Sequence, residues 1–555
     1  MQVSELITKI LEKEGITDAF GIPGAGINGV YKYLKDSPIK HYLMRHEEAA
    51  VHAADGYYRA AGKMALAICT SGPGATNFVT GLYTAWQDSI PLVAITGQAV
   101  TSQLGKGAFQ CVDIAEIAKT VVKKSWCVTD AAKIPEIFRE AFETALSGRP
   151  GPVLIDLPLD VQNAEINFDI DSYTPSRIAA PKPDKALLEK AVKLLEEAKN
   201  PVIIMGGGVI LSRVEKTLLE FAEYMSVPVI TTYMAKGGIP LEHPLYAGQM
   251  GIQAGAVSSG NEVFLASDLV LGIGCRFTDR HTGAAPVYQG ERKFIHIDID
   301  PKEIGKIIKT DLGITADAAD AAPLLLEIAR ASPARQRPAP VTPYADIRKK
   351  YVRAPDPAKE VMDPREVFEA VNLAFDDDTQ YTTGCGITQI WSGQYQRINK
   401  PRKYFPSGGA GTLGYDIPAA IGAAVGSHGE KTVCLMGDFG FTFLVEELGV
   451  AAAYDLPVVV LIINNAYLGL IRQNQKYAYG YEYQVAMKEN KGLMDYVKVA
   501  EGFACKAERV FTYAELDKAL KNAIAAKGPY VIDIIVNDNT DCDMGNDIAH
   551  IRHFE

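Results

Sequence analysis

Short apolar runs rich in β-branched residues alternate along the chain with longer stretches in which apolar residues recur at helical spacing. In each part of the chain such a run is followed by a glycine turn and then by a helical stretch. This order is typical of a parallel strand followed by a crossover helix. The clearest runs are MALAICTSGPG and PLVAITGQ in the first part, PVIIMGGG and LVLGIGCRF in the middle, and KTVCLMGD and VVVLIINN in the last. The pattern predicts an α/β fold built from doubly wound parallel sheets.

The length of the chain and its proline positions predict how these sheets are divided. A chain of 555 residues is too long for one core and predicts three or four domains at about 150 residues each. Two proline-bearing stretches, Asp171–Asp184 and Ser332–Pro364, interrupt the alternation, which is typical of linkers. We therefore expect three units, residues 1–170, 185–331 and 365–555. Ligands of parallel sheets bind at the carboxyl ends of the strands, so we expect the functional residues in the loops there.

Charge and composition exclude several classes of function. The net charge of −11 disfavours binding to nucleic acid, because a negative surface repels the phosphate backbone. The longest apolar run, about eight residues around Val458, is far shorter than the roughly 20 residues that cross a bilayer. The N-terminal segment mixes charges into an amphipathic pattern unlike a secretory signal, so we expect a cytoplasmic protein. The eight cysteines form no CxxC pair and are interpreted as buried small residues rather than as disulfides or a zinc site.

Two strand ends in the last part of the chain predict a metal site. Gly437-Asp438 closes one strand, and Asn464-Asn465 closes the next, with 24 residues between GDF and NN. The carboxyl ends of parallel strands meet at one edge of the sheet, so Asp438 and Asn465 should lie together. With diphosphate oxygens and a backbone carbonyl near Tyr467, they form the oxygen-rich set that Mg²⁺ prefers. Either half alone would be interpreted as an ordinary turn.

This spacing resembles the diphosphate motif of thiamine diphosphate (ThDP) enzymes, with Phe439 where the motif usually has glycine and Gly440 following it. The segment TTGCGITQIW resembles the second diphosphate-binding turn of the same enzymes. The resemblance implies cofactor contacts from Gly386, Ile387, Thr388, Gly411, Gly437, Asp438, Phe439, Gly440, Asn465, Tyr467, Leu468 and Gly469, with Asp438, Asn465 and Tyr467 at the metal.

The first unit resembles the part of these enzymes that activates the cofactor. In RHEEAAVHAADGYYRAAG, Glu47 stands at the position of the glutamate that hydrogen-bonds the pyrimidine ring and promotes loss of a proton from the thiazolium carbon C2. Leu413 matches the apolar residue beneath the bent cofactor. Taken singly, Glu47 would be an ordinary helix-start residue and Leu413 a core residue. The resemblance further implies cofactor contacts from Pro23, Pro73 and Asn77, and a substrate pocket lined by Phe109 and Gln110, although Phe109 equally suits plain packing.

The sequence of the middle unit predicts a second cofactor, one that contains a nucleotide. Glycines at a strand end allow a pyrophosphate to approach the backbone, and an arginine can pair with it as a planar fork. Acidic side chains at later strand ends suit ribose hydroxyls. These segments resemble the FAD-binding domain of acetolactate synthases and glyoxylate carboligases, which implies FAD contacts from Gly206, Gly207, Gly208, Arg276, Arg280, Asp298 and Asp317. The sequence leaves open whether the flavin is structural or redox-active.

The order of the three units resembles that of the acetohydroxyacid synthase superfamily. Within it the chain most resembles glyoxylate carboligases, through LASDLVLGIGCRFTDRHTG, NNAYLGLIRQNQ and the C-terminal MGNDIAHIRHFE. The resemblance implies a reaction that joins two glyoxylate molecules to tartronate semialdehyde and CO₂. It also implies a homodimer or homotetramer with active sites between subunits.

Three positions bear on the choice of substrate. Acetolactate synthases usually have lysine where Leu159 stands and tryptophan where Asn474 stands, which argues against them. Glyoxylate carboligases have an apolar residue where Glu47 stands, which argues the other way. The alternatives are therefore an acetolactate synthase acting on pyruvate and a flavin-dependent 2-oxo acid oxidase. The presence of Glu47 together with the two metal-site residues disfavours a non-catalytic scaffold.

Overall fold

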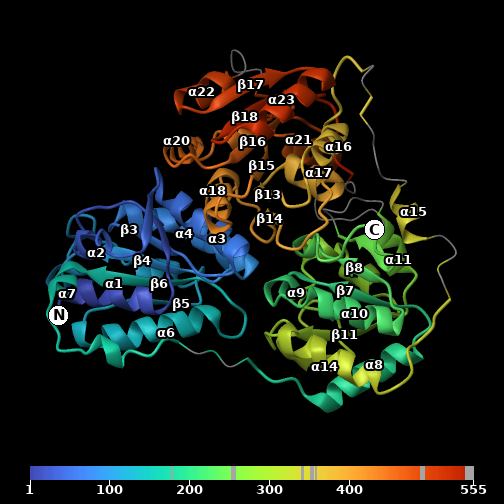
Figure 1. Ribbon diagram of the computed structural model, residues 1–555, viewed down its shortest axis with the longest axis horizontal. Helices are drawn as coiled ribbons and strands as arrows, with labels where there is room; N and C mark the ends of the chain where they lie inside the picture. The colour runs from blue at the N-terminus through green and yellow to red at the C-terminus, as the bar shows by residue number, and fades with distance from the viewer. Residues whose placement is uncertain are drawn as a thin grey trace.

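The computed structural model describes residues 1–176, 178, 180–251, 258–338, 340, 343–349, 355–356, 359–487 and 494–543. Within these residues three six-stranded sheets follow one another along the chain, and their strands pair in parallel. Figure 1 shows the first unit in blue, the middle unit mainly in green and the last in orange and red, arranged around a common junction. The predicted α/β fold of doubly wound parallel sheets is confirmed. The segment 544–555, which contributed to the resemblance, lies outside the described residues.

The first sheet has the strand order β2-β1-β3-β4-β6-β5. Its strands are β1 (Asp18–Gly21), β2 (Lys40–Leu43), β3 (Leu66–Cys69), β4 (Val93–Gln98), β5 (Lys124–Cys127) and β6 (Val153–Pro158). Its helices are α1 (Val3–Lys13), α2 (Asn28–Leu34), α3 (Glu47–Ala61), α4 (Pro73–Asp88), α5 (Ile114–Ala118), α6 (Ile134–Leu146) and α7 (Leu159–Asn163). Strands β3, β4 and β6 are buried along their whole length, as expected of a sheet covered by helices on both faces.

The middle sheet has the order β12-β11-β10-β7-β8-β9. Its strands are β7 (Pro201–Met205), β8 (Val229–Thr231), β9 (Tyr246–Gln249), β10 (Leu269–Ile273), β11 (Lys293–Asp298) and β12 (Leu312–Thr315). Its helices are α8 (Lys185–Glu197), α9 (Gly207–Leu211), α10 (Glu215–Met225), α11 (Ser259–Leu265), α12 (Asp279–Thr282), α13 (Ala285–Gln289) and α14 (Ala318–Arg330), with the 3₁₀ turn η4 (Tyr233–Ala235) and, farther along, α15 (Tyr344–Lys349).

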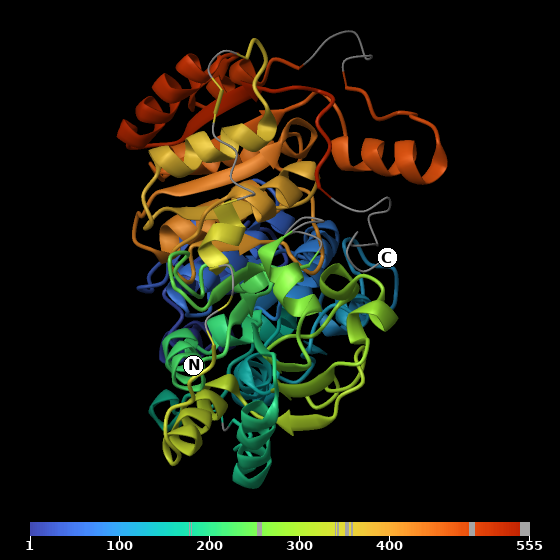
Figure 2. The same ribbon diagram turned by 90° about the vertical axis from the view of Figure 1, so that its right-hand side faces the viewer.

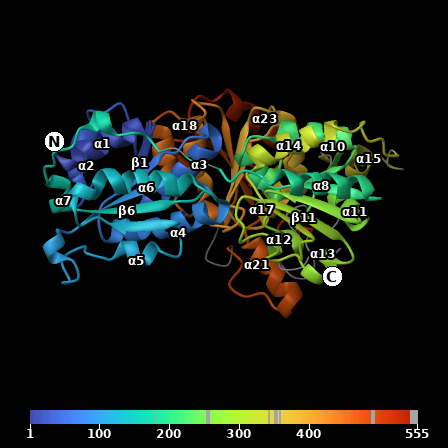
Figure 3. The same ribbon diagram turned by 90° about the horizontal axis from the view of Figure 1, so that it is seen from below.

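The last sheet has the order β14-β13-β15-β16-β18-β17. Its strands are β13 (Gln380–Thr383), β14 (Tyr404–Pro406), β15 (Thr432–Gly437), β16 (Val458–Asn464), β17 (Lys506–Val510) and β18 (Tyr530–Ile535). Its helices are α16 (Pro364–Ala374), α17 (Ile387–Tyr395), α18 (Asp416–Gly426), α19 (Asp438–Phe441), α20 (Leu448–Ala453), α21 (Gly469–Asn474), α22 (Tyr496–Gly502) and α23 (Tyr513–Ala525), with the short helical segments η6 (Val445–Glu447) and η7 (Gln475–Tyr479). Figures 2 and 3 show the segment of α21 and η7 projecting away from the body of this unit.

The first and last units are joined by close packing of α3 against α18 (Figure 1). Glycine permits this approach at two positions. A Cβ atom on Gly56 would lie 2.1 Å from the carbonyl oxygen of Ala419, and one on Gly422 would lie 1.8 Å from that of Ala53. Any side chain would therefore force the helices apart. The apolar side chains of this junction belong to one buried cluster that spans both sheets.

Other whole-chain features concern membranes and cysteines. Among the described residues, no helix combines the length and apolar character that a membrane span requires. Five cysteines are buried, whereas Cys111, Cys127 and Cys385 are partly exposed.

Candidate functional site

The carboxyl ends of β15 and β16 bring Asp438 and Asn465 to one edge of the last sheet. The two strands pair in parallel register, with Gly437 opposite Ile463. Asp438 is buried, its Oδ1 accepts from the amide of Phe439 at 2.9 Å, and its Oδ2 has no hydrogen-bond partner among the described residues. Burial raises the pKa of this carboxyl to about 7. The buried, unpaired oxygen is the feature that a cation would satisfy.

The turn before α17 lies against the same edge. Gly386 has φ +108°, which favours glycine, and it precedes the nine-residue helix whose first turn contains Thr388. The hydroxyl of Thr388 is buried without a partner among the described residues, and it lies 3.4 Å from where a Cβ on Gly437 would stand. A helix N-terminus with a free hydroxyl beside glycines is suited to bind phosphate oxygens.

The segment that follows β16 completes this group. The side-chain oxygen of Asn465 accepts from the amide of Tyr467 at 3.2 Å, which fixes the turn before Leu468 and α21. A Cβ on Gly469 would lie 2.6 Å from Nδ2 of Asn465 and 2.9 Å from Cγ2 of Ile387. The structure therefore brings the beginning of α17 and the end of β16 into contact, and glycine is required where they meet.

Leu413 and Gly411 lie in the loop before α18. Gly411 has φ +62°, and its amide donates to the carbonyl of Ser407 at 3.1 Å. Leu413 is half-buried, and its Cδ2 lies 3.8 Å from the Cβ position of Gly440. The ring of Phe439 packs instead against Phe443, with centroids 5.4 Å apart. Leu413 is thus placed beside the Asp438 loop.

Glu47 is the first residue of α3, and its carboxylate lies against the first turn of α4. Asn77 donates to Glu47 Oε2 at 2.8 Å, and Oε1 lies 3.1 Å from the Cβ position of Gly74. Pro73 begins α4, where a missing amide costs nothing. Pro23 is exposed in the loop after β1. Within the described residues, no hydrogen bond joins Glu47 to the Asp438 group.

Phe109 and Gln110 lie in the loop before α5. Phe109 is 89% exposed, so in the isolated chain it is not a packing residue. Gln110 has φ +52°, and its Cα lies 2.8 Å from the Cβ position of Gly72. The Gly72–Pro73 turn, Gln110 and Glu47 therefore occupy one end of the first unit.

A cavity of about 520 Å³ opens at the carboxyl end of the middle sheet. Gly207, Gly208, Arg276, Arg280, Asp298 and Asp317 all line it. Gly206 is not among the lining residues; its Cβ would lie 2.0 Å from the carbonyl oxygen of Gly274, so glycine is needed for chain packing there. Burial raises the pKa of Asp298 to about 6.

All three units contribute to this cavity. Its arginines are Arg59 and Arg149 from the first unit, Arg213, Arg276 and Arg280 from the middle unit, and Arg402 from the last. The arginines of the first and last units were not among the residues predicted from the sequence. The only local signal was the spacing of Asp55 and Arg59, which are four residues apart on α3. The excess of positive charge makes the cavity suited to an anionic ligand.

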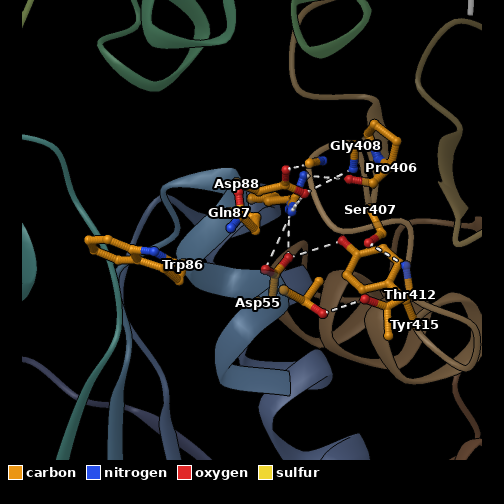
Figure 4. Close-up of polar contacts among 12 residues, drawn as sticks. Asp55, Trp86, Gln87, Asp88, Pro406, Ser407, Gly408, Thr412 and Tyr415 are labelled. Atoms are coloured by element: carbon orange, nitrogen blue, oxygen red, sulfur yellow. Dashed lines mark hydrogen bonds and ion pairs between the residues drawn. The ribbon is translucent and has the colours of Figure 1, made fainter. Parts of the chain in front are cut away.

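One wall of the cavity is a buried ionic network that joins the first and last units (Figure 4). Arg59 donates to Asp55 at 2.6 Å, to Asp88 at 2.9 Å and to the carbonyl of Pro406 at 2.9 Å. Asp88 also accepts from the amides of Gly408 and Gly409 in the last unit. Neighbouring opposite charges raise the pKa of Arg59 despite its burial, so the guanidinium stays charged.

Comparisons with known proteins agree with this architecture. Three profiles of thiamine pyrophosphate enzymes match in order: the N-terminal TPP binding domain at residues 1–117, the central domain at 188–325 and the C-terminal TPP binding domain at 384–534. Among the described residues no cluster of three or more His, Cys, Asp or Glu side chains could hold a metal. A single carboxylate with an amide oxygen and a diphosphate is compatible with that finding.

Curated relatives cover nearly the whole chain. The glyoxylate carboligase of Escherichia coli O157:H7 is 43% identical, over 100% of this chain and 96% of its own length. The acetolactate synthase large subunit of Corynebacterium glutamicum is 39% identical, over 97% of this chain and 87% of its own length. These matches and the three domain profiles show that the chain belongs to the thiamine pyrophosphate enzymes, in their carboligase family.

Proposed function

We propose that the protein is a ThDP- and Mg²⁺-dependent carboligase that joins two glyoxylate molecules into tartronate semialdehyde. Two glyoxylate anions and one proton yield one tartronate semialdehyde anion and one CO₂. The observation that carries this proposal is the 43% identity, over the full chain, to a glyoxylate carboligase. Leu159 and Asn474, which replace residues usual in acetolactate synthases, support the same choice.

The residues of the last unit fit the diphosphate and its metal. Asp438 offers a buried carboxylate oxygen without a partner, and Thr388 offers a buried hydroxyl in the same condition. Asp438, Asn465 and the main chain near Tyr467 would hold Mg²⁺, while Thr388 and the first turn of α17 would bind the diphosphate. When bound, ThDP supplies a nucleophilic carbon and an electron sink for the loss of CO₂.

The residues of the first unit are suited to proton transfer and substrate enclosure. Glu47, oriented by Asn77, would hold a proton at the pyrimidine end of the cofactor. Leu413 would support the cofactor from below. Phe109 and Gln110 would line the substrate side, where an apolar surface excludes water and favours loss of the carboxylate as CO₂.

We propose that each active site is completed by a second copy of the chain, in a homodimer or homotetramer. Glu47 is hydrogen-bonded within its own unit, and the described residues contain no hydrogen bond between it and the Asp438 group. Phe109 is 89% exposed, and the segment of α21 and η7 carries tyrosines 477 and 479 that are 50% and 69% exposed. These surfaces are those expected to be covered in an assembly.

We propose FAD as the occupant of the three-unit cavity. Its volume of about 520 Å³ lies in the range of ligand pockets. Arg276 and Arg280 would pair with the pyrophosphate, Gly207 and Gly208 would let it approach the backbone, and Asp298 and Asp317 would accept from ribose hydroxyls. The hydroxyl of Ser212 already donates to Asp317 at 2.7 Å, which fixes the orientation of that carboxylate.

Glu47 favours one alternative, an acetolactate synthase that acts on pyruvate, because glyoxylate carboligases have an apolar residue there. The two activities are separated by measuring kcat/KM for glyoxylate and for pyruvate, with ThDP and Mg²⁺ present or omitted after chelation. We expect a preference for glyoxylate and a requirement for both cofactors. A preference for pyruvate supports the alternative, whereas oxygen uptake at the turnover rate would indicate a flavin-dependent oxidase.

A further inference from the structure

The loop that leads into α3 is held by side chains of the last unit. Glu447, in η6, accepts through Oε1 from the amides of Arg45 at 2.9 Å and His46 at 2.8 Å. The hydroxyl of Tyr454, just after α20, accepts from the amide of Leu43 at 2.9 Å. These bonds join residues about 400 positions apart in the chain, and they end one residue before Glu47.

The buried side chain of Glu447 acts as a hydrogen-bond acceptor rather than as a charged carboxylate. Its side chain is fully buried, and its Oε2 has no hydrogen-bond partner among the described residues. Burial raises the pKa of Glu447 to about 8, although the amides of Arg45 and His46 act in the opposite direction. The group is therefore mostly uncharged at neutral pH, and its contribution is a carbonyl-type acceptor for two backbone donors.

We propose that Glu447 is a positioning residue for Glu47, holding the main chain before α3 so that the Glu47 carboxylate faces the cofactor. This inference rests on the proposed function. Glu47 is then fixed from two directions, because Glu447 holds the main chain just before it and Asn77 donates to its carboxylate. Glu447 follows Asp438 by nine residues, so in the proposed assembly one segment of the last unit presents the metal ligand of one active site and orients the proton-transferring group of the other.

A purely structural role for Glu447 predicts a different outcome when it is removed. The two units are also held by the packing of α3 on α18 and by the Arg59 network. Removing Glu447 should therefore leave the units docked. It would, however, leave the partly buried amides of Arg45 and His46 without their acceptor, which favours a local rearrangement of the loop.

The experiment measures how fast the C2 proton of bound ThDP exchanges for deuterium, by acid quench and NMR, in the assembled holoenzyme. Glu447→Ala should slow the exchange at least tenfold, whereas Glu447→Gln, which keeps the acceptor oxygen, should stay within about twofold of wild type. Glu446→Ala removes the neighbouring carboxylate, which makes no side-chain hydrogen bond within the described part of the chain, and is the matched control. The affinity for ThDP should change less than twofold in all of these variants.

A double variant separates positioning from general damage. In a Glu47→Gln background, adding Glu447→Ala should slow exchange no further, because the group that Glu447 orients is already gone. An equal slowing in both backgrounds, a wild-type rate in Glu447→Ala, or a parallel loss of ThDP affinity would overturn the positioning role. If Glu447→Ala does not fold, Glu447→Asp replaces it, since the shorter carboxyl group no longer reaches both amides.

The same measurement distinguishes this inference from the proposed function. Wild-type protein that accelerates exchange, and loses that acceleration in Glu47→Gln, establishes Glu47 as the activator. Wild-type protein that does not accelerate exchange overturns the assignment of Glu47 and the role of Glu447 together. Acceleration in wild type with an unaffected Glu447→Ala variant overturns the role of Glu447 alone.

Discussion

Replacing Arg59, which lies at the junction between the first and last units, with methionine should lower the free energy of unfolding of the protein by about 3 kcal/mol. Arg59 is only 7% exposed at its side chain, and its two carboxylate partners, Asp55 and Asp88, are fully buried. Methionine has a similar apolar stem but no charge, so two carboxylates remain buried without their counter-ion.

The magnitude follows from what each carboxylate retains. Breaking a buried ion pair by removing one partner costs about 3–5 kcal/mol. Asp88 keeps the amides of Gly408 and Gly409 at 3.0 and 2.7 Å, and Asp55 keeps the hydroxyl of Tyr415 at 3.0 Å. These remaining donors place the expected cost at the lower end of the range.

The assay is urea denaturation of the holoprotein followed by tryptophan fluorescence, since Trp86 lies two residues from Asp88 at the end of α4. Replacing both Asp55 and Asp88 with asparagine in the Arg59→Met background should restore at least half of the lost free energy of unfolding. A loss below about 1 kcal/mol in Arg59→Met, which is the size of an exposed ion pair, would show that the two carboxylates do not depend on Arg59 for their stability. A further loss when both carboxylates are replaced by asparagine would show the same.

Three other substitutions test separate parts of the structure. Burial raises the pKa of Asp156 to about 7. The stability that protonated Asp156 contributes is therefore complete below the ordinary carboxyl pKa of about 4 and is lost as the pH rises through 7. Asp156→Asn should make the fall of melting temperature with rising pH shallower, and an unchanged slope would contradict this. Lys236 donates to the carbonyls of Ser392 and Gly393 near the end of α17. Lys236→Met should weaken ThDP binding about tenfold, because the helix loses these bonds. Equal dissociation constants for ThDP in the variant and the wild type, measured by titration, would count against this. Arg276→Met should lower the flavin content of the purified protein by at least half, measured by visible absorbance, and full flavin content would exclude a pyrophosphate contact.

Local pattern was sufficient to predict the strands and the edge at which they end. The runs before Gly437 and Asn465 are continuous apolar segments, and each has turn residues at its carboxyl end. The parallel pairing of β15 with β16 then follows from the right-handed crossover that connects them. Gly207 and Gly208 lie at the cavity for the same reason. Such features depend only on neighbours in the chain.

The contacts between units could not be predicted in this way. Glu447 lies in an unremarkable Glu-Glu pair, and its partners are about 400 residues away. Arg149 lines the cavity from a turn before β6 whose residues gave no sign of a ligand. Neither position belongs to a local periodicity, because its role arises only when separately folded units dock.

The proposed carboligase activity is tested by the product formed from ¹³C-labelled glyoxylate and unlabelled pyruvate supplied together to the holoenzyme with ThDP and Mg²⁺. Carbon NMR identifies which molecule loses CO₂ and which carbon–carbon bond forms. We expect labelled tartronate semialdehyde as the main product, with no product in Glu47→Gln. Acetolactate as the main product, or an unchanged yield in Glu47→Gln, would contradict it.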